Sequence, residues 1–301
     1  MDSYIIRKHC GRGYKYYTKG DKEIKLTREL EAYITENYIP PAYKNVHINL
    51  KKRADVYAIG TDAKGRKQYL YRKKHTEQSS KDKFKKLIEF GKIYPNLRRD
   101  ITTLLKSSDK RQHEIGMVLK LMIDCNFRVG NDVYQKDNKS FGTTTIQGRH
   151  IQNVKGGVEI SFIGKKGVEN TAKVSDKRLV KSLKKLRGGR KPVFSIDSTE
   201  INQYLKKYGD FTSKDIRTWQ ANILFIKNVC KLHNSNVKPK DTIKQASERT
   251  ADLLHHTPTV SKKSYIFKEL IVSYLGQHDK FYSYFSKNPE KQFICFLKKN
   301  L

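Results

Sequence analysis

Cysteine is scarce in this sequence, and its few residues stand far apart. No CxxC pair and no Cys/His spacing typical of a zinc site occurs, and a disulfide framework is not expected in a chain of 301 residues. No run of eighteen apolar residues is present, which excludes a helical membrane span. The first residues, 1–7, lack an apolar signal core, so we do not expect secretion. The four cysteines are Cys10, Cys125, Cys230 and Cys295.

Acidic residues are also few. The chain has 30 Asp and Glu against 63 Lys and Arg, which gives a net charge of +33. So large an excess predicts a polyanionic partner, because the field of the protein concentrates nucleic acid around it. Hydrophobic residues make up 37% of the chain, enough for folded cores, so a disordered basic tail is excluded. The length suits two domains.

Motifs for two common routes of phosphoryl chemistry are missing. The sequence has no D-x-D cluster of carboxylates for two-metal catalysis, and no Gly-x4-Gly-Lys-Ser/Thr loop for ATP. We therefore expect neither a metal nor a nucleotide cofactor.

The first seventy residues alternate between β-prone stretches and turn residues. The pattern predicts strands near 11–17, 46–48, 56–59 and 68–71, with a short helix over 26–33. The stretch 72–83 then contains no aliphatic or aromatic residue, which is typical of a linker. We place the boundary here, with a β-rich domain at 1–74 and a second domain at 75–301.

Helical periodicity dominates the second domain. A β interlude at 143–174 interrupts it, with strands expected near 143–146, 151–154 and 158–162 and a return strand over 168–174, and 164–167 is predicted to be a hairpin tip. The fold class is α+β: a small β-rich domain followed by a larger, mainly helical domain that contains a small three-stranded sheet.

A helix over 213–230 has an identifiable start, because Thr212 and Asp215 have the spacing of a capping box. Its apolar stripe contains Trp219, and Arg217 lies about 160° around the helix from that stripe at roughly 100° per residue. Arg217 is also in the first turn, where the helix dipole favours an anion. The alternative is a solvated arginine.

Two further cations sit beside predicted breaks in the backbone. Arg128 follows a helix that ends near Cys125 and precedes a Gly-Asn break, where its guanidinium is suited to a phosphate. Its alternative role is to complement the dipole at the end of that helix. Lys165 lies at the predicted hairpin tip, which can enter a DNA groove or can be basic for solubility alone.

The stretch 255–265, HHTPTVSKKSY, is the most informative. Thr257-Pro258 marks a break, and Ser261 is expected to cap a helix that carries Tyr265. The histidine pair is no zinc site, since no further ligands stand at suitable spacing. Tyr265 can equally be a core residue.

Taken together, five residues supply what phosphodiester cleavage without a metal requires. Two arginines and a histidine can neutralise charge on the non-bridging oxygens. A lysine can protonate the departing oxygen, and a tyrosine can hold the strand end covalently. These candidate catalytic residues are Arg128, Lys165, Arg217, His256 and Tyr265.

At these residues the chain resembles the type IB DNA topoisomerases of the compact poxvirus, giant-virus and bacterial branch. The five residues stand in F-R-V-G-N, F-I-G-K, K-D-I-R-T-W, H-T-P and S-K-K-S-Y, and in the first domain G-R-G-Y-K-Y-Y, I-P-P-A-Y and G-T-D-A-K-G-R-K-Q-Y-L-Y are also similar. His255 departs from the pattern, because relatives often have glycine before the catalytic histidine. The change bears on local backbone geometry.

The resemblance implies an enzyme that relaxes supercoiled DNA through a 3′-phosphotyrosyl intermediate, without ATP or metal. It implies a recombinase-like catalytic domain and a C-clamp around double-stranded DNA, with no membrane and with a monomeric chain in the cytoplasm or nucleoid, or in the virion of a virus. The DNA contacts that it implies, or that lie beside the site, are Gln68, Tyr69, Tyr71, Asn131, Tyr134, Lys214, Asn222, Lys262 and Lys263. Because Tyr69 and Tyr71 share one strand face and Gln68 faces away, one groove for all three requires twist or a bulge.

Two other functions remain open from the sequence. A tyrosine recombinase shares the catalytic fold and chemistry, but typically has His-x-x-Arg where this chain has Lys214 three residues before Arg217. A basic, non-catalytic DNA-binding or packaging protein would need none of the five residues.

Overall fold

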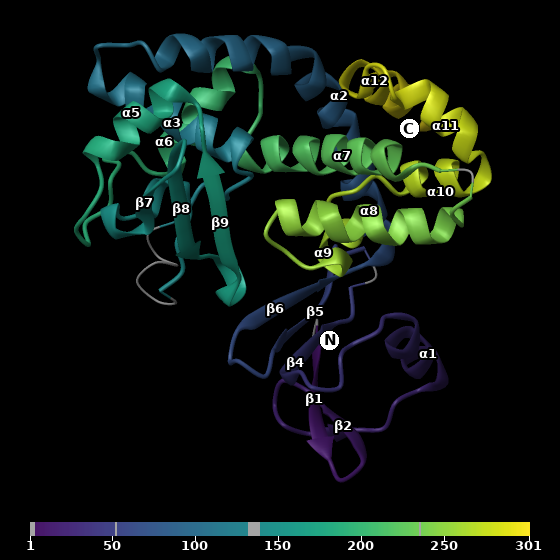
Figure 1. Ribbon diagram of the computed structural model, residues 1–301. Coiled ribbons are helices and arrows are strands. Elements are labelled where there is room, and N and C mark those ends of the chain that lie inside the picture. The colour runs from purple at the N-terminus through teal and green to yellow at the C-terminus, as the bar shows by residue number, and fades with distance from the viewer. Residues whose placement is uncertain (1–3, 52, 132–138, 235) are drawn as a thin grey trace. The chain divides into compact units, whose positions relative to one another are not determined.

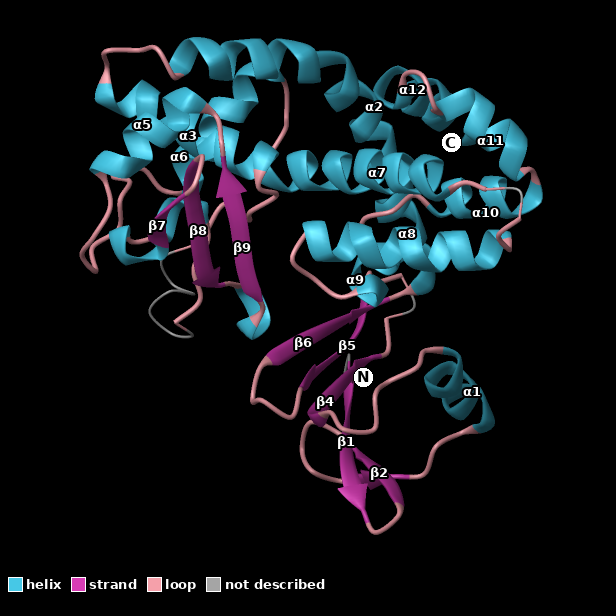
Figure 2. Ribbon diagram, viewed as in Figure 1, coloured by secondary structure: helices cyan, strands magenta, loops and turns pink. Residues whose placement is uncertain are grey.

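The computed structural model describes residues 4–51, 53–131, 139–234 and 236–301. The chain divides into two compact units, Met1–Lys83 and Phe84–Leu301. In Figure 1 they run from purple to blue and from blue to yellow, respectively. Figure 2 shows strands prevailing in the first unit and helices in the second. The expected mixture of a β-rich part and a mainly helical part is therefore confirmed.

The first unit is built on a six-stranded antiparallel sheet in the order β3-β2-β1-β4-β5-β6. Thr27 caps the single helix described before residue 73, α1 (Arg28–Glu36), by accepting a hydrogen bond from the backbone N–H of Leu30 at 3.3 Å. The strands are β1 (Tyr4–Cys10), β2 (Gly13–Tyr17), β3 (Glu23–Ile24), β4 (Lys44–Asn49), β5 (Val56–Thr61) and β6 (Lys67–Tyr71).

One face of this sheet forms the core of the first unit. Val46, Ile48 and Ala58 are almost completely buried there, and Leu70 of β6 packs against them. Side chains alternate across a strand, so the neighbours of Leu70, Tyr69 and Tyr71, lie on the other face. Both tyrosine rings are about half exposed, at 49% and 48%.

The segment expected to be a linker is helical instead. Residues 73–83 form the first part of α2 (Lys73–Leu104), a helix of 32 residues. The stretch lacks apolar residues, but it also lacks Gly and Pro and is rich in Lys, which favours helix. No helix in the described parts of the chain combines the length and apolarity needed to cross a membrane.

The second unit combines helices with a three-stranded antiparallel sheet, β7 (Ile151–Val154), β8 (Gly157–Ile163) and β9 (Glu169–Val174). Its sheet agrees with the expected β interlude, except that Thr143–Thr145 forms a 3-10 turn, η1, rather than a strand. The helices are α3 (Lys110–Asp124), α5 (Lys177–Lys185), α6 (Ser198–Leu205), α7 (Ser213–Leu232), α8 (Pro239–Leu253), α9 (Pro258–Ser264), α10 (Lys268–Gly276), α11 (His278–Phe285) and α12 (Pro289–Asn300), with 3-10 turns η2 (Gly148–His150), η3 (Lys165–Gly167) and η4 (Lys206–Tyr208).

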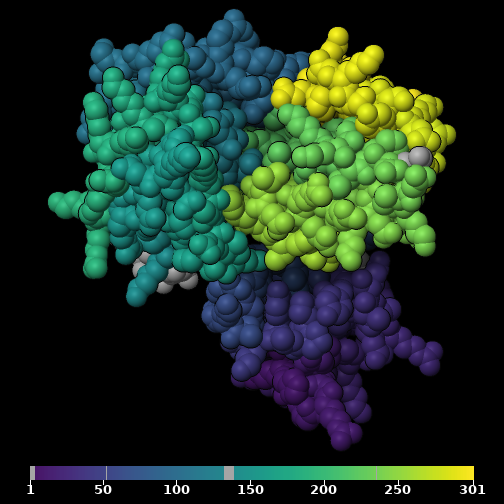
Figure 3. All heavy atoms as spheres, viewed as in Figure 1, coloured from purple at the N-terminus to yellow at the C-terminus, as the bar shows by residue number. Residues whose placement is uncertain are grey.

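Helix α7 lies at the centre of the second unit. Trp219 is 1% exposed and packs against the rings of Phe90, Tyr94 and Phe293. A Cβ at Gly91 would come within 2.6 Å of the Trp219 ring, so α2 approaches α7 this closely only because residue 91 is glycine. In Figure 3 the teal segments and the green to yellow segments of this unit meet along a seam on the visible face. The packing of Trp219 sets the rotation of α7 about its axis, so that the opposite side of the helix faces the candidate site.

Candidate active site

The start of α7 agrees with the capping box expected from the sequence. The backbone N–H and the hydroxyl of Thr212 both donate to the Asp215 carboxylate, at 2.8 and 2.9 Å. Lys86 lies 3.3 Å from the same carboxylate. This network fixes the first turn, and with it the direction in which Arg217 leaves the helix.

Arg217 is buried, with 7% of its surface exposed, so a solvated arginine is ruled out. Its Nη1 donates to the backbone carbonyl of Asn126 at 2.8 Å, and its Nη2 donates to the carbonyl of Leu254. Arg217 does lie off the Trp219 stripe, but the turns at 125–128 and 254–256 cover this side of the helix. The guanidinium therefore joins two turns that are far apart in sequence.

Arg128 lies in the first of these turns, just after α3. The N–H and hydroxyl of Thr143 both donate to the Arg128 carbonyl, at 2.7 and 2.9 Å. Thr144 holds the carbonyl of Val129 in the same way, at 2.6 and 2.9 Å. The 3-10 turn η1 thus holds the backbone that carries Arg128 in place. Because the N–H groups of Thr143 and Thr144 are used in these bonds, 143–145 does not pair as a strand.

His256 lies in the second turn, after α8. Its backbone N–H donates to Ala251 at 3.0 Å, and its Nδ1 is 3.4 Å from Nη2 of Arg217. Because Arg217 can only donate, Nδ1 accepts and the proton of a neutral ring sits on Nε2. Nε2 is buried and has no hydrogen-bond partner among the described residues. This N–H is therefore a donor suited to an anionic oxygen.

Tyr265 follows α9 directly. Thr257, and not Ser261 as expected, caps α9, and the backbone N–H of Tyr265 donates to the Ser261 carbonyl at 3.1 Å. The Thr257-Pro258 pair explains the difference, since proline is favoured at the first position of a helix. The ring of Tyr265 stacks on His256, with centroids 5.2 Å apart and planes at 27°.

Asn222 fixes the backbone on both sides of Tyr265. Its Nδ2 donates to the Tyr265 carbonyl at 2.9 Å, and its Oδ1 accepts from the N–H of Phe267 at 2.8 Å. Asn222 is completely buried. In this structure Asn222 supports the backbone at Tyr265, and the DNA contact with which it was grouped from the sequence stays a prediction.

The centre of the site is strongly positive. Both Arg128 and Arg217 interact with the side chain of Tyr265, and burial lowers the pKa of each guanidinium. Burial, followed by the charges of Arg217 and Arg128, lowers the pKa of His256 to about 3. The site therefore holds two cations and a neutral histidine around one phenol.

The histidine gives a prediction for stability. In the unfolded chain His256 titrates near 6.5, so between that pH and about 3 the unfolded state binds more protons. The contribution of the neutral ring to the free energy of unfolding is present above pH 6.5 and is lost as the pH falls below it. We expect the melting temperature of wild type to fall between pH 7.5 and 5.5 by on the order of 2–4 °C more than that of His256→Asn. Thermal unfolding followed by the fluorescence of Trp219, the sole tryptophan, measures this; equal falls would contradict it.

Lys165 lies on a different element from the other four residues. It is exposed in η3, at the tip between β8 and β9, beside Lys166 with its left-handed φ of 66°. The hairpin tip expected from the sequence is thus confirmed. The contacts above bring together Arg128, Arg217, His256 and Tyr265, and Lys165 stands at the end of the hairpin.

The remaining residues expected to contact DNA fall into three groups. On β6, Tyr69 and Tyr71 share one face, where Tyr71 stacks on His75, and the Gln68 amide donates to Asp62 at 2.9 Å on the opposite face. Tyr134 lies outside the described residues. The exposed members of the second unit are Asn131, Lys214, Lys262 and Lys263.

Three residues that hold the site were not singled out as site residues from the sequence. Asn126 has a left-handed φ of 55° and presents its carbonyl to Arg217. Thr143 and Thr144 grip the Arg128 loop. The available signals were the position of Asn126 at the end of the helix before Arg128, and the Thr-Thr-Thr run. The partners of these residues lie 15 to 91 positions away.

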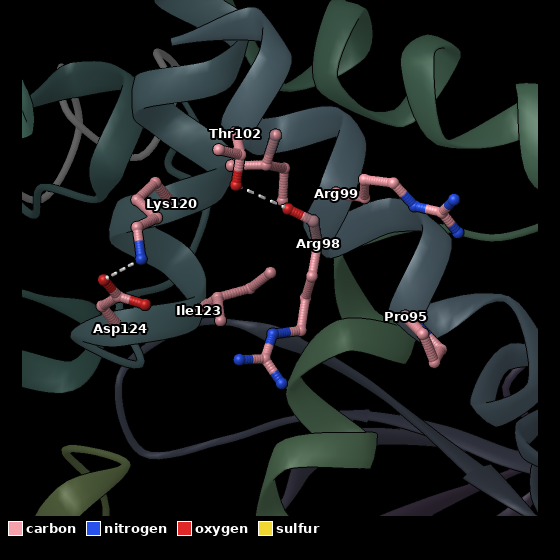
Figure 4. Close-up of a pocket in the computed structure, with 8 residues that line it drawn as sticks. Pro95, Arg98, Arg99, Thr102, Lys120, Ile123 and Asp124 are labelled. Carbon is pink, nitrogen blue, oxygen red and sulfur yellow. Dashed lines mark hydrogen bonds and ion pairs between the residues drawn. The ribbon is translucent and has the colours of Figure 1, made fainter.

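A separate pocket of about 350 Å³ is formed by α2 and α3, away from the four grouped residues. Figure 4 shows Lys120 paired with Asp124 at its wall, at 2.7 Å, and Arg98 reaching across it. No cluster of three or more His, Cys, Asp or Glu side chains suited to a metal occurs within the described residues.

Comparison with known proteins decides the family. Residues 70–288 match the family described as eukaryotic DNA topoisomerase I, catalytic core. The chain belongs to the DNA topoisomerase I family. It is 29% identical to the DNA topoisomerase 1B of Acanthamoeba polyphaga mimivirus over 98% of this chain and 94% of that protein. It is 27% identical to the DNA topoisomerase 1 of rabbit fibroma virus over 73% and 72%. It is also 27% identical to the DNA topoisomerase 1B of vaccinia virus (strain Copenhagen) over 69% of each.

Family membership confirms the resemblance to a compact viral type IB topoisomerase. It favours a topoisomerase over the two alternatives, a recombinase and a non-catalytic DNA-binding protein. The family acts on DNA, which agrees with the net charge of +33.

Proposed function

We propose that this topoisomerase relaxes supercoiled duplex DNA by cutting one strand with Tyr265, allowing rotation, and rejoining the strand. The observation that carries the proposal is the placement of Tyr265. Its side chain interacts with both Arg128 and Arg217, and its ring lies against His256. A phenol among two guanidinium groups and a neutral N–H donor is suited to attack a phosphodiester.

In the proposed reaction the Tyr265 oxygen forms a bond to phosphorus and the bond to the 5′-oxygen breaks. Tyr265 loses its proton to water, and the departing oxygen gains one from Lys165. The products are a 3′-phosphotyrosyl link and a free 5′-hydroxyl, and attack by that hydroxyl reverses every step. One ester replaces another, so the cycle needs no external energy source.

Three donors stabilise the transition state in this scheme. Charge builds on the non-bridging oxygens of the phosphate as Tyr265 attacks. Arg128 and Arg217 neutralise it, and the Nε2–H of His256 donates to one of these oxygens. The low pKa of His256 means that it acts as a hydrogen-bond donor and not as a cation in the DNA-free protein. Since the buried contacts of Arg217 already fix it, little reorganisation is required.

We further propose that the two units enclose the duplex as a C-clamp, that the second unit has a recombinase-like fold, and that the enzyme acts as a monomer. The charge of +33 supports phosphate contacts on both units. The exposed Tyr69 and Tyr71 are suited to base edges in the major groove. Tyr134, Asn131, Lys214, Lys262 and Lys263 remain proposed contacts of the catalytic unit.

The direct test is relaxation of a supercoiled plasmid in EDTA and without ATP. We expect full activity, because the guanidinium groups occupy the role that metal ions have in other phosphoryl-transfer sites. Denaturation during the reaction should trap protein on the 3′ end of a labelled strand. Loss of activity in EDTA with recovery in Mg²⁺, or trapping on the 5′ end, would overturn the proposed chemistry.

A further inference from the structure

His255 has an uncommon backbone conformation. It has a left-handed φ of 49°, a region that few non-glycine residues enter, although Asn, Asp and His enter it more often than the others. Such a conformation persists only where the surrounding structure holds it, and it is concentrated at functional sites. The residue lies immediately before His256, in the turn that closes α8.

The imidazole ring of His255 ties this turn to the end of α3. Its Nε2 lies 3.0 Å from the carbonyl oxygen of Cys125, which is 130 positions earlier in the chain. A carbonyl only accepts, so the neutral ring carries its proton on Nε2 and donates it. The ring also packs on Phe127, with centroids 5.4 Å apart. The side chain therefore contacts the residues that immediately precede Arg128.

The backbone of His255 reaches Arg128 itself. Its carbonyl oxygen accepts from Nη1 of Arg128 at 3.4 Å. The left-handed conformation is what lets one residue direct its ring toward Cys125 and its carbonyl toward the guanidinium. Arg128 is half-buried, and its side chain also interacts with Tyr265.

We infer that His255 is a positioning residue for DNA cleavage: its ring and carbonyl together hold the guanidinium of Arg128 beside Tyr265. The inference rests on the proposed function. A glycine at this position could adopt the same backbone conformation, but it has no ring to bind Cys125. The inferred role therefore belongs to the histidine side chain.

The charged groups facing His255 favour its neutral form. Arg128 and Arg217 both lie near the ring, His256 is adjacent in sequence, and Cys125 supplies only a carbonyl oxygen. Burial, and after it the two arginine charges, lowers the pKa of His255, while the hydrogen bond to Cys125 acts in the opposite direction. The tie to Cys125 does not depend on this charge state, because Nε2 carries a proton in the protonated ring as well as in this neutral tautomer.

The test compares His255→Gly and His255→Asn with wild type in single-turnover cleavage of a labelled duplex that carries a mapped cleavage position. Both replacements tolerate the left-handed backbone. We expect His255→Gly to lower the cleavage rate by about 10- to 100-fold and DNA affinity by less than about twofold. Asparagine retains a donor and should recover part of the rate. A wild-type rate for His255→Gly would overturn the inference.

A double-mutant cycle with Arg128→Ala separates positioning from general loosening of the fold. If His255 acts through Arg128, His255→Gly should lower the rate by less than about threefold in the Arg128→Ala background. An equal loss in both backgrounds would show that the residue does not position Arg128. If Arg128→Ala alone left cleavage unchanged, the proposed function of Arg128 would fail instead, so the two failures are distinguishable.

Discussion

Replacing Tyr265 by phenylalanine is expected to abolish relaxation, with a loss of about 10⁵-fold or more, while DNA binding is retained. The hydroxyl oxygen is the atom that forms the covalent link, and no other group of the site can take its place. The change should leave the fold intact. The ring keeps its stack on His256. Asn222 binds the carbonyl of residue 265 and the N–H of Phe267, and its bonds do not involve the hydroxyl.

Plasmid relaxation, adduct trapping and equilibrium binding to a short duplex measure the three parts of this expectation. Tyr282→Phe is the matched control, because Tyr282 is an exposed tyrosine of the same unit on α11, 40% exposed, outside the grouped residues. The control should relax DNA at the wild-type rate. Relaxation by Tyr265→Phe at more than a trace level would mean that another nucleophile acts.

The outline of this protein could be predicted from local signals. The capping box of Thr212 and Asp215 depends on residues three apart and is present in the structure. The alternation in 158–162 marks β8, which is also a short-range pattern. Local rules failed where two of them competed. Residues 73–83 look like a linker by hydropathy but like a helix by propensity, and propensity prevailed as α2 continued into the second unit.

The burial of Arg217 was beyond local reasoning. The helical period correctly places it off the Trp219 stripe, and an isolated charged side chain there is most often solvated. What buries it are carbonyls of Asn126 and Leu254, 91 and 37 positions away. The combination of five residues suited to one reaction was the only sequence signal that pointed to this closure.

The site is held mainly by backbone carbonyls that accept from functional side chains or from their supports. Arg217 uses two of them, Thr143 holds that of Arg128, and Asn222 holds that of Tyr265. Any residue type supplies a carbonyl, so no motif records these contacts. The candidate residues could therefore be chosen from the sequence, whereas the contacts that bring four of them together could not.

Lys165→Ala is expected to lower DNA cleavage by roughly 10²–10⁴-fold while DNA binding remains nearly unchanged. The 5′-oxygen leaves as a strongly basic alkoxide unless it receives a proton in the transition state. Lys165 is exposed at the tip of the β8–β9 hairpin, on an element separate from the four grouped residues. This separation suits a proton donor that approaches the leaving oxygen from the DNA side, and not a fourth ligand for the non-bridging oxygens.

A duplex whose 5′-bridging oxygen is replaced by sulfur tests the role at a single atom. A thiolate leaves without a proton, because its conjugate acid is far stronger than an alcohol. Cleavage of this duplex by Lys165→Ala should return towards the wild-type rate, whereas His256→Ala should not recover, since its donor faces a non-bridging oxygen. Lys166→Ala, which removes the neighbouring charge of the same turn, is the control and should cleave both duplexes at nearly wild-type rates. If sulfur fails to rescue Lys165→Ala, the lysine stabilises charge or anchors the hairpin. The proton would then have to reach the leaving oxygen by a relay through Arg128, whose high pKa makes it a poor acid on its own.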